Sequence, residues 1–163
     1  MNINKRQVII GLISLFLGFA VYIIRSPGHI YFVSRYCSCI QLADDILKVV
    51  KIVDNNLPDF IHPFAFILIT SGLISLDNKL SQFFVCLGWF FVEGFFEFGQ
   101  HFKESYLRFI PSWFDNIPLL DNTKYFFQNG TFDVIDMLSI FAGTVMAFCV
   151  LLITSNRGEK NEN

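Results

Sequence analysis

Ionisable and amide side chains interrupt otherwise apolar segments of this chain at three places. Glu93, Glu97 and Gln100 are spaced four and three residues apart, so a helix would present all three on one face. His62 lies near the start of an earlier apolar run, and Asp136 lies near the start of a later one. These groups can accept or donate protons, and together they suit the binding of a cationic or hydroxyl-rich headgroup.

The composition indicates that these residues belong to a membrane protein. Of the 163 residues, 53% are hydrophobic, 21 are phenylalanine and only 16% are charged, whereas a soluble domain carries about 25% charged residues. A soluble fold of this size leaves too much area facing water to hide so much apolar surface. The net charge of −2, without a basic stripe, excludes a nucleic-acid-binding protein.

Four apolar segments are expected to cross the membrane as helices. Three of them hold 17 residues and the fourth holds 21, and about 20 residues are needed for a full span. They are residues 8–24, 60–76, 83–99 and 134–154. The first is interpreted as a retained anchor, because no small-residue cleavage pattern follows it. We therefore predict an all-α fold: a polytopic four-transmembrane-helix bundle in one domain, residues 1–154, with a flexible polar tail, residues 155–163.

Two longer segments are expected outside the hydrocarbon layer. Residues 40–57 repeat apolar positions with a helical period and carry charges on the opposite face, which predicts an amphipathic interfacial helix. Residues 101–132 mix aromatic rings with prolines, a composition that suits headgroup depth. Cys37 and Cys39 would lie outside the membrane, as two thiols or as links to other chains.

Antiparallel spans bring the polar residues to one membrane face. Lys5 and Arg6 precede the first span, which favours cytoplasmic N and C termini and a place in the cell (inner) membrane. The face that holds the polar residues is then the outer one. Intramembrane carboxylates normally turn toward the bundle interior or a wet cavity.

We take these residues as one candidate pocket. The candidate catalytic residues are His62, Glu97, Gln100 and Asp136, and the candidate binding residues are Glu93 and Asp133. Purely structural interpretations are also open: Asp133 and Asp59 fit helix caps, and Glu97 fits a hydrogen bond to a neighbouring helix. Neither a metal-ligand pattern nor a cofactor motif is recognisable, so no metal or cofactor is expected. A nucleophile motif is equally absent from the sequence, and catalysis stays an open question.

Short motifs between residues 62 and 143 resemble the VanZ-like membrane proteins. The resemblance is carried by Glu97-Phe98-Gly99-Gln100, by Thr131-Phe132-Asp133-Val134-Ile135-Asp136, and by His62 and Gly143. The chain departs from the family pattern in three places. The family has an Asp-Lys pair four and three residues before its histidine, whereas this chain has Asp59 three residues before it and no lysine. Asn129-Gly130 replaces an arginine, and Ile140 replaces an asparagine. The resemblance implies a cell-envelope role at the outer leaflet, related to glycopeptide resistance.

Two functions follow as hypotheses. In the first, the pocket binds or modifies an amphiphilic envelope molecule at the outer face, with membrane lipids as its surroundings. In the second, the chain is a non-catalytic membrane subunit that docks a partner protein through residues 40–57 and its outer loops. Loss of function in Glu97→Gln and Asp136→Asn variants favours the first, and a stoichiometric partner protein favours the second.

Overall fold

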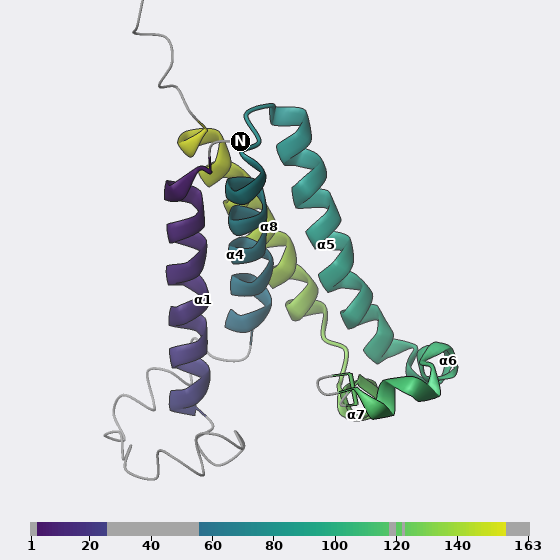
Figure 1. The fold of residues 1–163 in the computed structure, drawn as a ribbon. Helices are drawn as coiled ribbons and strands as arrows, with labels where there is room; N and C mark the ends of the chain where they lie inside the picture. Colours follow the sequence, from purple (N-terminus) through teal and green to yellow (C-terminus); the bar gives the residue numbers. More distant parts are fainter. Residues whose placement is uncertain (1–2, 26–55, 118–119, 122, 156–163) are drawn as a thin grey trace, which may run out of the picture.

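The computed structural model describes residues 3–25, 56–117, 120–121 and 123–155. Within these ranges the chain forms helices and connecting turns, without a β-strand, so the predicted all-helical class is confirmed. The helices are α1 (Lys5–Arg25), α4 (Leu57–Ile74), α5 (Lys79–His101), α6 (Lys103–Phe109), the 3-10 helix η1 (Ser112–Asn116), α7 (Thr123–Asn129) and α8 (Val134–Thr154) (Figure 1). Nearly all of the expected amphipathic segment 40–57, together with Cys37 and Cys39, lies outside the described residues.

Local chemistry explains where the long helices begin. Helix α4 begins after Asn56 and carries Pro58 in its first turn, where a missing N–H removes no helical hydrogen bond. The side chain of Asn78 accepts a hydrogen bond of 2.9 Å from the Leu80 N–H and caps α5. Helix α4 therefore begins three residues before the expected span 60–76, and α5 begins four residues before the expected span 83–99.

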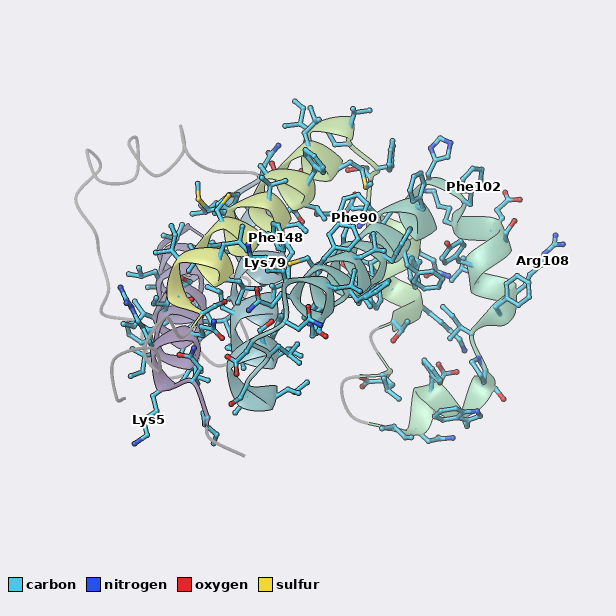
Figure 2. The ribbon with its side chains drawn as sticks, turned by 90° about the horizontal axis from the view of Figure 1, so that it is seen from above. Lys5, Lys79, Phe90, Phe102, Arg108 and Phe148 are labelled. Carbon is cyan, nitrogen blue, oxygen red and sulfur yellow. The ribbon has the colours of Figure 1, made fainter. Side chains whose placement is uncertain are left out.

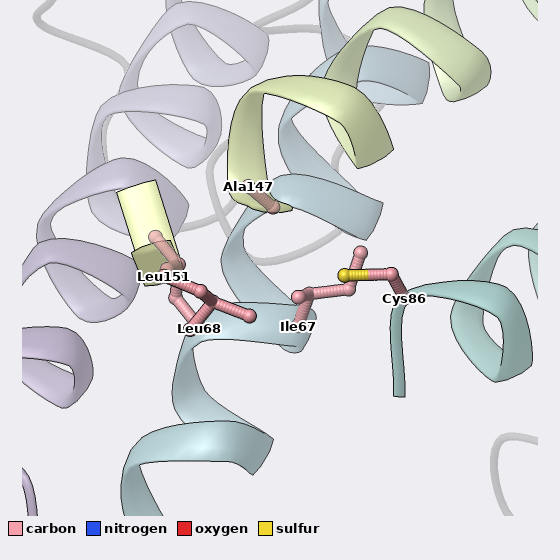
Figure 3. Close-up of a cluster of buried hydrophobic side chains, with 5 residues drawn as sticks. All are labelled: Ile67, Leu68, Cys86, Ala147 and Leu151. Carbon is pink, nitrogen blue, oxygen red and sulfur yellow. The ribbon is translucent and has the colours of Figure 1, made fainter. Parts of the chain in front are cut away.

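The four long helices alternate in direction along the chain (Figure 1). Helix α4 is central, since it packs against α1, α8 and α5, and it lies between α1 and α5 when seen from above (Figure 2). A cluster of buried apolar side chains joins α4, α5 and α8 and contains Ile67, Leu68, Cys86, Ala147 and Leu151 (Figure 3). The antiparallel hairpin expected from the short connector after residue 76 is present between α4 and α5.

In the part of the chain that the structure describes, three helices, α4, α5 and α8, are long and apolar enough to cross a membrane. Their outward faces carry large apolar side chains, such as Phe91 at 64% exposure and Ile153 at 71%. A surface of this kind suits contact with lipid chains. The first expected span, residues 8–24, falls within α1, which packs along α4. That α1 also crosses the membrane stays a prediction.

Two buried glutamines tie the helices together at the end of the bundle where α1 begins and α8 ends. The Gln7 Nε2 atom donates a hydrogen bond of 3.1 Å to the Thr154 Oγ1 atom and so joins α1 to α8. The Gln82 Nε2 atom donates hydrogen bonds of 2.6 Å to the Leu76 carbonyl and to the Ser155 Oγ atom. These contacts fix the lengthwise register of the helices, and hence which residues meet at the opposite end.

Candidate functional site

A cavity of about 550 Å³ lies at the end of the bundle where α4 and α8 begin and α5 ends. Its walls come from these three helices and from α7. The lining residues are Asp59, His62, Glu93, Phe96, Glu97, Gln100, Thr123, Phe126, Asp136 and Ile140. Four of these side chains are carboxyl groups, and none of the described lining residues is lysine or arginine. The cavity is therefore acidic.

Helix α5 contributes the stripe expected from the spacing of its polar residues. Glu97 and Gln100 are 7% and 8% exposed, and the Gln100 Nε2 atom donates a hydrogen bond of 3.0 Å to the Glu97 Oε1 atom. The other carboxyl oxygen of Glu97, Oε2, is buried and has no hydrogen-bond partner among the described residues. A buried, unpaired carboxylate oxygen costs free energy unless a donor or a cation meets it. Glu97 thus keeps a hydrogen-bond acceptor that no described residue satisfies.

Helices α4 and α8 bring two further carboxyl groups together. Asp59 and Asp136 both line the cavity and interact with each other, and Asp59 also interacts electrostatically with Glu93 and Glu97. Two neighbouring carboxylates repel each other when both are ionised, and a cation or a proton placed between them relieves that repulsion. The α4–α8 contact therefore adds a second anionic centre to the one that Glu97 provides.

The close contact between α4 and α8 depends on a glycine. A Cβ atom added to Gly143 would collide with the Phe60 carbonyl oxygen and would lie only 3.1 Å from the Phe60 carbonyl carbon. Because Phe60 follows Asp59 in the chain, this approach holds Asp59 beside α8 and near Asp136. A larger residue at this position would separate the two carboxyl groups.

Helix α7 covers the cavity and is positioned by aromatic packing. Phe127 is 2% exposed and stacks on Phe96, with ring centres 6.1 Å apart. Gly99 makes this possible, since an added Cβ would strike the Phe127 ring. After α7, the Gly130 backbone lies against Gln100, because an added Cβ would be only 2.6 Å from the Gln100 Cδ atom. The segment 101–132, expected at headgroup depth, thus supplies part of the cavity wall.

The structure brings most of the predicted site residues together. His62, Glu93, Glu97, Gln100 and Asp136 all line the cavity. Asp133 does not: its carboxylate accepts a hydrogen bond of 2.9 Å from the Ile135 N–H and caps α8, as its structural interpretation predicted.

Sequence reasoning missed five lining residues, of which Asp59 matters most. Its interpretation as a helix cap is wrong, because the N-cap of α4 is Asn56 and Asp59 falls within the first turn. Asp59 precedes His62 by three residues and so shares its helix face, a signal that was present in the sequence. The other four lining residues are Phe96, Thr123, Phe126 and Ile140. The first three carry no distinctive sequence signal, and Ile140 stands where the VanZ-like pattern has an asparagine.

Among the described residues, no group of three or more His, Cys, Asp or Glu side chains is arranged to hold a metal ion. The four carboxyl groups are spread around a cavity whose volume falls in the range of about 300–1,000 Å³ that is typical of small-molecule sites. This spacing suits an organic cation better than a small bare ion. Comparison with family models, with curated proteins and with solved structures found no match to this chain.

Proposed function

We propose that this chain is a multi-pass membrane protein whose acidic cavity binds the cationic headgroup of an amphiphilic cell-envelope molecule. The observation that carries the proposal is the buried Glu97 carboxyl, whose Oε2 atom lacks a partner among the described residues while Gln100 holds the other oxygen. A positively charged headgroup supplies the missing partner and offsets the repulsion among the four carboxyl groups.

The cavity also carries groups that recognise more than charge. The Gln100 amide donates one N–H to Glu97 and has a second N–H to offer a ligand. The His62 imidazole lies in the cavity lining and suits a hydroxyl group. His62 and Glu97 are both able to accept a proton from a bound molecule, so the proposal extends to modification of the ligand as well as to its binding.

The proposed location is the outer face of the cell (inner) membrane. Four antiparallel spans, with α1 as the first, would leave both termini in the cytoplasm, which Lys5 and Arg6 favour by the positive-inside rule. The cavity lies at the end of the bundle away from the termini, and this orientation would open it to the outer leaflet. The resemblance to VanZ-like proteins supports the same envelope role.

The experiment measures binding of decyltrimethylammonium to the protein in lipid nanodiscs, with empty nanodiscs subtracted. Glu97→Gln keeps the shape of the side chain and removes its charge, so affinity should fall by roughly 30-fold or more, the equivalent of losing one buried charge contact. Glu104→Gln on α6 is the matched control, because Glu104 lies at the same end of the molecule, exposed and outside the cavity lining.

The headgroup requirement is tested with ligands of equal chain length. Decyl sulfate and decyl maltoside carry an anionic and a neutral headgroup, and neither should show a dependence on Glu97. The proposal is wrong if Glu97→Gln and Asp136→Asn both leave the affinity for decyltrimethylammonium unchanged in protein that elutes as the same monodisperse species.

A further inference from the structure

A second cavity lies beside the acidic one, beneath the segment that folds back from the end of α5. It measures about 530 Å³ and is almost wholly apolar. Its walls come from α5, α6, η1 and α7 and from the turns between them. The residues that line it on the α6 and η1 side are Tyr106, Phe109, Ile110, Pro111 and Phe114, with Leu120 closing the wall.

The two cavities share part of their lining. Phe96 and Thr123 line both, so the apolar cavity begins where the acidic one ends. A third cavity of about 520 Å³, between α1 and α4, shares only His62 with the acidic cavity. The arrangement therefore sets a charged compartment directly beside an aromatic one, and Phe96 and Thr123 line both.

We propose that the apolar cavity holds the hydrocarbon chain of the same molecule whose cationic headgroup occupies the acidic cavity. This inference rests on the proposed function and narrows its ligand to a cationic amphiphile. The protein would bind both the headgroup and the hydrocarbon chain, and so withdraw the whole molecule from the surrounding lipid. The occupant is identified by complementarity. On one side of Phe96 and Thr123 the described lining has carboxyl groups and no lysine or arginine, and on the other side it has aromatic and aliphatic side chains.

Chain length gives the decisive measurement. Hexyl-, octyl- and decyltrimethylammonium are bound to the protein in nanodiscs, and each dissociation constant is expressed against the free aqueous concentration found by dialysis. Transfer of each methylene group from water into the apolar cavity should tighten binding by about fourfold. Glu97→Gln should weaken all three ligands by the same factor and leave this dependence on chain length intact.

Filling the cavity should remove the chain-length dependence alone. Leu120→Trp places a large ring in the apolar cavity, so the gain per methylene should fall below about twofold while the hexyl compound binds nearly as before. Leu15→Trp is the matched control, since Leu15 lines the third cavity instead. Ile110→Trp fills the same cavity as Leu120→Trp from another wall and serves if Leu120→Trp does not fold.

The outcomes separate the two proposals. A flat chain-length series in the unmodified protein overturns the chain site, even when Glu97→Gln weakens binding. Loss of the dependence in Leu15→Trp rather than Leu120→Trp assigns the chain to the third cavity and also overturns it. If Leu120→Trp is destabilised and its affinity still depends on chain length as before, the protein's own side chains fill the cavity. That result also overturns the proposal. If Glu97→Gln has no effect while Leu120→Trp flattens the series, the headgroup proposal fails and the chain site stands.

Discussion

Replacement of Gly143 by alanine tests whether the approach of α4 to α8 builds the acidic cavity. The added Cβ would overlap the Phe60 carbonyl oxygen and lie 3.1 and 3.2 Å from the carbonyl carbon and Cα of Phe60. All three atoms belong to the backbone of α4, so no side-chain rotation relieves the overlap. The two helices must move apart, and overpacking of this kind costs about 1–3 kcal/mol of stability.

The matched control is Gly88→Ala on α5, where an added Cβ meets nothing within 4 Å. Both substitutions gain up to about 1 kcal/mol of helix propensity, so the difference between the two variants isolates the helix contact. We expect Gly143→Ala to be less stable than Gly88→Ala by about 1–3 kcal/mol. The free energy of unfolding is measured for each variant by titration with sodium dodecyl sulfate in mixed micelles.

The movement of α4 away from α8 should also change the acidic cavity. Since Phe60 adjoins Asp59, moving α4 away from α8 separates Asp59 from Asp136 and weakens the anionic centre between them. Gly143→Ala should therefore bind decyltrimethylammonium less tightly, whereas Gly88→Ala should bind it as the unmodified protein does. Equal stability of the two variants, together with equal affinity, would refute the idea that this contact positions the carboxyl groups.

Three further predictions follow from single contacts. Asp133→Ala removes the α8 cap and should cost about 1 kcal/mol of unfolding free energy, with unchanged affinity for decyltrimethylammonium; a loss of affinity would return Asp133 to the site. Gly130→Ala should push Gln100 away from Glu97 and weaken binding by about fivefold, equivalent to about 1 kcal/mol, in the same nanodisc assay; unchanged affinity would remove Gln100 from the headgroup site. Gln82→Leu should cost about 1–2 kcal/mol in mixed-micelle unfolding, because the hydrogen bonds to the Leu76 carbonyl and to the Ser155 hydroxyl are lost. It should leave the affinity intact because Gln82 lies at the opposite end of the bundle; reduced affinity with normal stability would contradict this separation.

Hydrophobic runs and residue spacing were sufficient to predict the long helices and the end of the bundle at which the polar groups meet. Apolar runs of 17 to 21 residues can satisfy their backbone hydrogen bonds in lipid only as helices or as a closed barrel, and their length favours helices. Successive spans must cross the membrane in opposite directions, which assigns His62, Glu97 and Asp136 to one end whatever the side-chain packing. The i, i+4, i+7 spacing likewise placed Glu93, Glu97 and Gln100 on one face.

Only the tertiary structure decided which of these residues share a cavity. In the sequence Asp59 and Asp133 look alike, because each is a carboxylate beside the start of a helix. In the structure Asp133 caps α8, whereas Asp59 lines the cavity. The difference depends on contacts between segments far apart in the chain: the approach of α4 to α8 at Gly143, and the docking of α7 beside Gly99. Hydrophobic period and helix capping are local properties of one segment. The shape of a cavity depends on how closely separate helices pack, and this packing depends on the side chains of both helices.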